Sequence, residues 1–239
     1  MPVFEDGARR IHYEVVGEGF PVLTIAPGGL RSVAARWETA PYRPAERLGD
    51  RYRVIAMDQR NAGSSFAPIA ADEGWDRYTR DQLDLLDHLG VDRFAVMGMC
   101  IGGAYVAGLL RAAPDRAVAG VMLQPIGLED NREAFHELFD GWVAEIRDRH
   151  PEADDACWAA FRARMFDGPF LFNATEAQVA QIEQPLLVLR GDDLYHPSSV
   201  SRRVAELAPR ATLVERWKEG ADLEAAAATI AAFLAEHAR

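Results

Sequence analysis

Short runs of apolar residues alternate along this chain with stretches whose apolar residues recur at helical spacing. The runs predict strands at residues 11–16, 22–26, 54–57, 94–97, 117–123, 185–190 and 211–216. Helical spacing covers 78–89, 198–207 and about 223–236, and a further helical pattern includes Trp37 and Leu48. This alternation is typical of a mostly parallel sheet covered by helices.

The alternation of strand and helix patterns is interrupted between residues 131 and 184. Trp142, Ile146, Trp158, Phe161 and Met165 recur there at helical intervals, with no strand pattern between them. We interpret 131–184 as a short helical cap inserted between two strands. Residues 1–130 and 185–239 would then form the α/β core.

Composition limits the class of partner. The 239 residues are 49% hydrophobic, enough for a sizeable core, and the formal net charge is −11. This acidity disfavours a nucleic-acid or membrane partner and leaves a small-molecule substrate as the expectation; a homodimer stays open. The start of the chain lacks a signal-peptide pattern and no apolar run is long enough to span a bilayer, so a cytoplasmic location is expected.

Six residues, 98–103, carry the clearest chemical signal. They read Gly-Met-Cys-Ile-Gly-Gly, directly after an apolar run and before a helical stretch of small residues. A strand that turns sharply into a helix around a reactive side chain is a nucleophile elbow, with the pattern G-x-nucleophile-x-G. The residue at its apex is Cys100. The pattern predicts a thiol that attacks acyl groups.

Four motifs in order resemble those of the α/β-hydrolase family over nearly the whole chain. They are the 27–29 turn Pro-Gly-Gly, the 58–64 turn Asp-Gln-Arg-Asn-Ala-Gly-Ser, the elbow, and the 191–197 segment Gly-Asp-Asp-Leu-Tyr-His-Pro. The resemblance implies about eight strands. It also implies an oxyanion hole formed by the backbone N–H groups of Gly29 and Ile101. A cysteine nucleophile resembles the dienelactone-hydrolase-like members of the family.

The general base is the departure from the family pattern. The loop after the last strand, 217–222, reads Trp-Lys-Glu-Gly-Ala-Asp and holds no histidine. His196 follows Asp193 by three residues, in the segment that carries the family's acid, and we expect this pair to serve as base and acid. Glu219 is the alternative base. The other histidines are expected to be structural (His12, His88 and His237) or, within the cap, able to reach a substrate (His136 and His150).

Two cysteines are present, and neither a disulfide with Cys157 nor a metal site is expected. The chain also lacks the glycine-rich phosphate-binding motifs, so no cofactor is implied. We therefore expect a cysteine hydrolase of an ester, thioester or lactone that acts through an acyl-enzyme. Two alternatives remain: a non-hydrolytic enzyme on the same fold (a lyase, cyclase or isomerase), favoured by the missing histidine, and a non-catalytic small-molecule binding protein.

Overall fold

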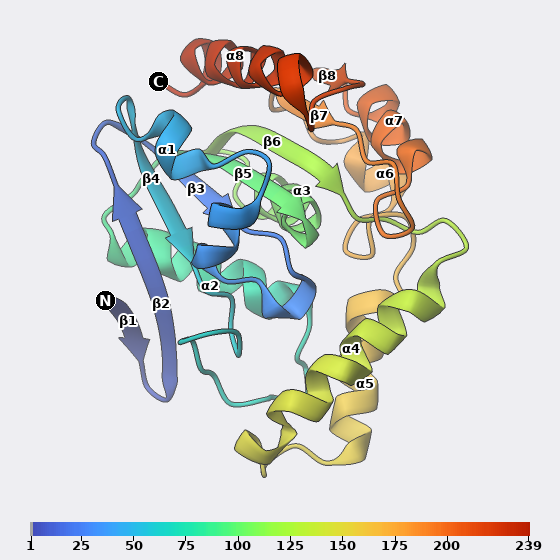
Figure 1. Ribbon diagram of the computed structural model, residues 1–239. Helices are drawn as coiled ribbons and strands as arrows, with labels where there is room; N and C mark the ends of the chain where they lie inside the picture. The colour runs from blue at the N-terminus through green and yellow to red at the C-terminus, as the bar shows by residue number, and fades with distance from the viewer. Residues whose placement is uncertain (1) are drawn as a thin grey trace.

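The computed structural model describes residues 2–239 and contains an eight-stranded sheet with helices on both faces (Figure 1). The strands are β1 (Val3–Asp6), β2 (Arg9–Val16), β3 (Phe20–Ile25), β4 (Tyr52–Met57), β5 (Phe94–Cys100), β6 (Ala117–Pro125), β7 (Leu186–Leu189) and β8 (Ala211–Val214). Their order is β1-β2-β4-β3-β5-β6-β7-β8. The β1–β2 and β2–β4 pairs are antiparallel, and the other pairs are parallel. This confirms the expected fold class.

The α-helices are α1 (Pro44–Leu48), α2 (Trp75–His88), α3 (Ile101–Ala112), α4 (Arg132–Ile146), α5 (Asp155–Phe166), α6 (Glu176–Val179), α7 (Ser198–Leu207) and α8 (Gly220–His237). Three 3₁₀ helices are η1 (Gly29–Arg31), η2 (Ala34–Thr39) and η3 (Arg147–Arg149). The helical pattern expected around Trp37 and Leu48 is therefore broken into short pieces. Pro44 explains part of this, because proline lacks an N–H and suits only the first turn, where it begins α1.

Successive core residues of the strands face opposite layers. On β5, Phe94 and Val96 pack with α2, α3 and α7, whereas Ala95 and Met97 pack with α1 and α8. This alternation follows from the two-residue period of a strand, and both layers are apolar because the sheet is covered on each face. At the end of β5, Cys100 contacts both clusters. Cys100 therefore lies at the end of β5, where the two layers meet.

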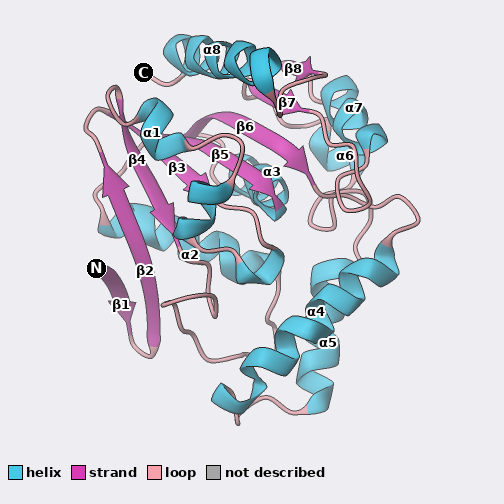
Figure 2. Cartoon of the chain, in the orientation of Figure 1, coloured by secondary structure: helices cyan, strands magenta, loops and turns pink. Residues whose placement is uncertain are grey.

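The segment between β6 and β7 is helical, consisting of α4, η3, α5 and α6. Figure 2 shows α4 and α5 together beyond the ends of the β5 and β6 arrows, away from the other helices. Aromatic side chains join the two helices, since Phe139 packs edge-on against Phe161 and Trp142 against Trp158. The division into core and cap domains stays a prediction, but this segment faces the sheet edge at which β5 ends.

In the part of the chain that the structure describes, no helix combines the length and the apolarity that crossing a bilayer requires.

Candidate active site

Cys100 is the last residue of β5 and immediately precedes α3. Its backbone angles, φ 61° and ψ −119°, lie in a region that residues other than glycine rarely adopt. Such a conformation costs on the order of 1–3 kcal/mol and persists only where the surrounding structure holds it. The strained turn places the Cys100 thiol at the edge of the sheet.

Glycines on either side make this turn sterically feasible. A Cβ at Gly98 would lie 2.1 Å from the carbonyl oxygen of Gly102, and a Cβ at Gly102 would lie 2.4 Å from the carbonyl oxygen of Ile25. A Cβ at Gly103 would meet Pro125 at 2.6 Å. Strands β3, β5 and β6 and helix α3 therefore approach one another at distances that only glycine allows.

The thiol faces a cavity of about 270 Å³. Most of its wall is apolar, and it comes from four places: the segment after β3, the elbow, the β6–β7 segment and the loop after β7. The lining residues are Gly28, Gly29, Leu30, Arg31, Arg36, Cys100, Ile101, Ile126, Phe135, Leu138, Phe139, Phe166, Tyr195 and His196. Its volume lies just below the roughly 300–1,000 Å³ typical of small-molecule sites, so it suits a compact ligand.

His196 and Asp193 form a pair beside this cavity. The Nδ1 atom of His196 lies 2.7 Å and 2.9 Å from the two carboxylate oxygens of Asp193. The backbone N–H groups of Tyr195 and His196 also donate to Oδ1 of Asp193, which holds the loop in a tight turn. Gly191 permits the loop to close, because a Cβ there would lie 2.3 Å from the carbonyl oxygen of His196.

Because Nδ1 donates to the carboxylate, Nε2 carries the lone pair of the neutral ring. Nε2 is buried, and no side chain or backbone group among residues 2–239 forms a hydrogen bond of ordinary geometry with it. The imidazole nevertheless lies close enough to Cys100 to interact with its thiol. It is therefore free to exchange a proton with the sulfur or with a bound molecule.

These contacts shift the pKa values of all three groups. Burial raises the pKa of the Cys100 thiol, but the neighbouring His196 imidazole and the N–H groups of Gly28 and Ile101 outweigh it, so the pKa is lowered. Burial lowers the pKa of His196, but Cys100 and Asp193 outweigh it and raise the pKa. The pKa of Asp193 is lowered, because its contacts with His196 outweigh burial. The arrangement favours a thiolate beside an imidazolium.

Two backbone N–H groups lie near the sulfur, and the oxyanion hole expected at Gly29 and Ile101 stays a prediction. Ile101 and Gly28 are the residues whose backbone N–H groups lower the pKa of Cys100. Gly29, which the resemblance implied, follows Gly28 in the same turn and lines the cavity. Both glycines have positive φ, 127° and 59°, so the turn has a conformation that side-chain-bearing residues rarely adopt.

Glu219, the alternative base, is not brought to this site. It is an exposed residue at the start of α8 and lines a different surface depression, with Asp192 and Trp217. The sequence pattern began the last helix at about residue 223, whereas α8 begins at Gly220. The first turn of α8 therefore includes part of the 217–222 segment, in which the family pattern has its histidine base.

The remaining histidines lie away from the cavity. His136 pairs with Asp167, and His150 pairs with Glu152 and stacks on Phe66, so neither histidine of the β6–β7 segment lines the cavity. His12 lies 3.3 Å from Asp58, while His88 and His237 pack against aromatic rings. Cys100 and Cys157 are both free, and the Cys157 thiol faces the carbonyl oxygen of Ala70 at 3.7 Å.

Within residues 2–239, no cluster of three or more His, Cys, Asp and Glu side chains has the arrangement of a metal site.

Several lining residues were not recognised from the sequence. Phe135, Leu138 and Phe139 recur at helical spacing on α4, a signal that predicts an apolar face but not what that face covers. Arg31 and Arg36 belong to none of the sequence motifs, so no sequence signal pointed to them. Trp37, Trp142 and Trp158 are buried and do not line the cavity.

Comparison with known proteins agrees with the architecture. A family model described as alpha/beta hydrolase fold matches residues 21–186. A candidate carbamate hydrolase, RutD, of Azorhizobium caulinodans is 34% identical over 48% of this chain, and the match covers only 41% of that relative. RutD of Variovorax paradoxus, of the same description, is 27% identical over 82% of this chain and 83% of its own length.

Among solved structures, the enol-lactonase from Burkholderia xenovorans superposes with a TM-score of 0.71. Its sequence is 22% identical, and the match covers 98% of this chain and 100% of that one. At this identity the likeness concerns the fold. Together with the family match, which spans more than half of the sequence, it shows that this chain belongs to the alpha/beta hydrolase fold family.

Proposed function

We propose that the protein is a hydrolase of a small ester, thioester or lactone, with Cys100 as nucleophile. The observation that carries this proposal is that Cys100 and His196 line one cavity, with Asp193 bound to the far side of the imidazole. The thiol pKa is lowered, and Nε2 of His196 has no hydrogen-bond partner among the described residues. The hydrolase names of the two RutD relatives are compatible with it. The missing histidine after β8 weakens the case less than the sequence suggested, because His196 supplies an imidazole from another loop.

Acylation follows from this geometry. The Cys100 thiolate attacks the substrate carbonyl carbon, and the electron pair of the C=O bond moves to oxygen. The N–H groups of Ile101 and of the Gly28–Gly29 turn donate to that oxyanion. The tetrahedral adduct collapses, the bond to the leaving oxygen or sulfur breaks, and imidazolium Nε2 of His196 gives that atom its proton. A thioester on Cys100 remains.

Deacylation uses the same groups in reverse. Neutral His196 accepts a proton from water through Nε2, and the hydroxyl oxygen attacks the acyl carbon. Collapse of the second adduct releases the carboxylic acid, which ionises in solution, and restores the thiolate and the imidazolium. Asp193 holds the ring through Nδ1 and stabilises its positive charge.

The test combines turnover with intact-mass measurement, using 4-nitrophenyl and thiophenyl esters of short acids. We expect Cys100→Ala to abolish turnover and the acyl adduct. His196→Ala should lower turnover by roughly 10²- to 10⁴-fold and let the adduct accumulate, because water is no longer activated. Cys157→Ser, which removes the other thiol, is the matched control and should behave as wild type.

Equal turnover in wild type and Cys100→Ala would overturn the nucleophile. The lyase or isomerase alternative would be favoured if the protein turned over a different class of substrate in this cavity without forming an acyl adduct on Cys100. Absence of both turnover and iodoacetamide labelling at Cys100 would favour a binding protein.

A further inference from the structure

The charged residues of the active-site cavity are all of one sign. Its wall is otherwise largely apolar, and no Asp or Glu is among the described residues that line it. Besides His196, the ionisable groups that can carry positive charge are Arg31 and Arg36, whose guanidinium groups are charged at any physiological pH. This is unexpected in a chain whose 37 acidic residues outnumber its 26 Lys and Arg.

The two arginines differ in their partners. Arg31 is already neutralised, because its Nε and Nη2 atoms donate to the two carboxylate oxygens of Glu145 at 2.8 Å each. This pair joins the loop after β3 to helix α4. Arg36 is exposed, and across residues 2–239 no carboxylate lies within ion-pair distance of its guanidinium. The cavity therefore has one arginine available for a ligand.

The backbone holds Arg36 in place at the cavity wall. It lies in η2, which follows the Gly28–Gly29 turn, and its N–H donates to the carbonyl oxygen of Val33 at 3.0 Å. The carboxylate of Asp58 accepts the N–H of Ala34 at 2.9 Å and so fixes the start of η2. A guanidinium on a fixed backbone at the cavity wall can select among ligands.

We propose that the substrate carries a carboxylate at the end remote from the scissile carbonyl, and that Arg36 binds this group. The inference rests on the proposed function, since the scissile end is placed at Cys100. The planar guanidinium suits a carboxylate through two parallel hydrogen bonds. The carbon chain between the two ends packs against the apolar wall formed by Leu138 and Phe139.

The matched probes are 4-nitrophenyl hexanoate and the mono-4-nitrophenyl ester of adipic acid, which differ in one terminal carboxylate. The readout is the ratio of kcat/KM for the anionic ester to that for the neutral ester, in which general effects of a variant cancel. We expect Arg36→Gln to lower this ratio roughly five- to tenfold, and Arg36→Lys to lower it less, because the charge remains. Half-esters of succinic to suberic acid locate the best chain length.

Arg210→Gln is the control, because Arg210 is an exposed arginine between α7 and β8 and does not line the cavity. It should leave the ratio unchanged. Raising the ionic strength should reduce the wild-type ratio toward that of Arg36→Gln, since an exposed ion pair is screened by salt. An identical ratio in wild type and Arg36→Gln for every chain length would overturn the proposal.

A second measurement separates this inference from the proposed function. Binding of adipic acid monoamide and of hexanamide to Cys100→Ser requires no turnover. If neither ester is hydrolysed but the monoamide binds more tightly than hexanamide in an Arg36-dependent manner, the hydrolase proposal fails and the anion site stands. If both esters are hydrolysed equally and both amides bind equally, only the anion site fails.

Discussion

Two features of Cys100 are energetically unfavourable: its backbone conformation and the burial of its thiol. Its backbone is strained, with φ 61°, and its thiol lies in surroundings that by themselves raise the thiol pKa. The neighbouring His196 imidazole opposes the second effect, together with the backbone N–H groups of Gly28 and Ile101. The reactivity of the sulfur therefore depends in part on one side chain that is distant in sequence.

This dependence predicts the pH profile of alkylation. A lowered pKa means that the thiolate forms at lower pH, so iodoacetamide should label Cys100 at pH values where an ordinary thiol reacts slowly. In His196→Gln only the backbone N–H groups of Gly28 and Ile101 still oppose the effect of burial, so the midpoint of the labelling rate should move to higher pH. Both proteins should carry Cys157→Ser, so that a single thiol is measured.

Burial raises the pKa of the Cys157 thiol, so the protein without that substitution should show a second, slower phase at higher pH. A labelling midpoint that is the same with and without His196 would contradict the coupling between the imidazole and the sulfur.

At the scale of elements, the elbow depends on how closely α3 approaches the sheet. The Gly102 position lies against the carbonyl oxygen of Ile25 on β3, and Gly98 lies against Gly102 itself. The obstacles are backbone atoms, which cannot rotate aside as a flexible side chain can. A methyl group at either glycine must therefore move α3 relative to the strands.

We expect Gly102→Ala to lower the free energy of unfolding by about 3 kcal/mol, in the upper range for overpacking, and to slow labelling of Cys100 because the turn is displaced. Gly141→Ala is the matched control. Gly141 lies on the exposed face of α4 with its nearest neighbour, Arg31 Nη2, at an ordinary 3.7 Å.

Gly141→Ala should raise the free energy of unfolding by about 0.5–1 kcal/mol, since alanine suits a helix interior better than glycine. Urea unfolding measures both variants. Equal effects at the two positions would mean that the close approach at the elbow is not what requires glycine.

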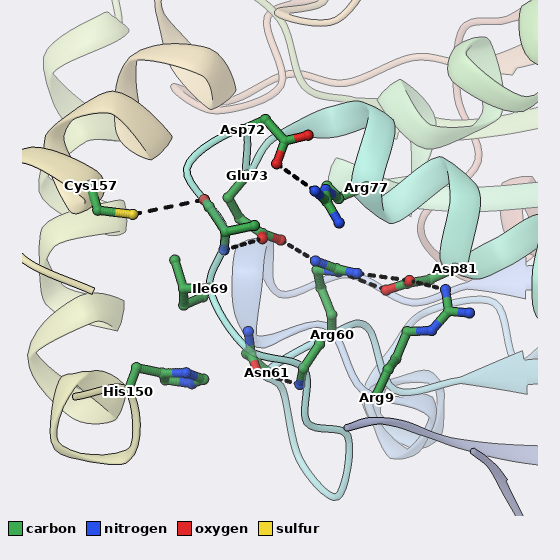
Figure 3. A network of polar contacts seen from close by, with 12 residues as sticks. Arg9, Arg60, Asn61, Ile69, Asp72, Glu73, Arg77, Asp81, His150 and Cys157 are labelled. Atoms are coloured by element: carbon green, nitrogen blue, oxygen red, sulfur yellow. Dashed lines mark hydrogen bonds and ion pairs between the residues drawn. The ribbon is translucent and has the colours of Figure 1, made fainter. Parts of the chain in front are cut away.

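At the scale of the whole molecule, a buried ion network joins distant segments (Figure 3). Arg60 donates to both carboxylate oxygens of Asp81 on α2, at 2.7 Å and 2.8 Å, and contacts Glu73. Arg9 of β2 reaches the same Asp81 at 2.7 Å. The network ties the loop after β4 to β2 and α2.

The same loop also reaches the β6–β7 segment. The N–H of Ile69 donates to Glu152 at 2.9 Å. The Cys157 thiol contacts the same loop at the carbonyl oxygen of Ala70, and Figure 3 shows Cys157 directed toward it. The loop thus has one side on the core and the other on the helices that close the cavity. Its conformation depends on the charges that Arg60 neutralises.

Arg60→Met should therefore lower the free energy of unfolding by about 3–5 kcal/mol, because Glu73 and Asp81 are left as buried charges without their main partner. Thermal and urea unfolding measure it. Arg203→Gln, which removes an arginine from an exposed pair with Glu176, should leave the unfolding midpoint nearly unchanged. Similar losses in both variants would contradict the role assigned to burial.

Much of the fold follows from local patterns in the sequence. The strands at the centre of the sheet and the helix at 198–207 were expected close to where they lie, because apolar periodicity reflects burial directly. Short β1 and the broken helical stretch before β4 were missed or misassigned. Their conformations depend on pairing with β2 and on proline positions, and neither produces a strong periodic signal.

The candidate site also has one part that local sequence predicts and another that depends on tertiary packing. The elbow is a local motif, and Cys100 could be placed at its apex from six residues because the glycine spacing reflects backbone geometry. The grouping of Cys100 with His196 could only be hypothesised from the sequence, and Glu219 remained the alternative base. Only the packing of the loop after β7 over the end of β5 distinguishes them, since it buries His196 at the cavity and leaves Glu219 exposed at the start of α8.

The cavity itself belongs wholly to the tertiary structure. Arg36 and the aromatic face of α4 are separated by about a hundred residues and meet only because the β6–β7 segment lies over the carboxyl ends of the parallel strands. Periodicity and turn motifs describe interactions between neighbours in the chain. The charge and shape of the cavity arise from contacts between segments far apart in sequence, which the completed sheet brings together.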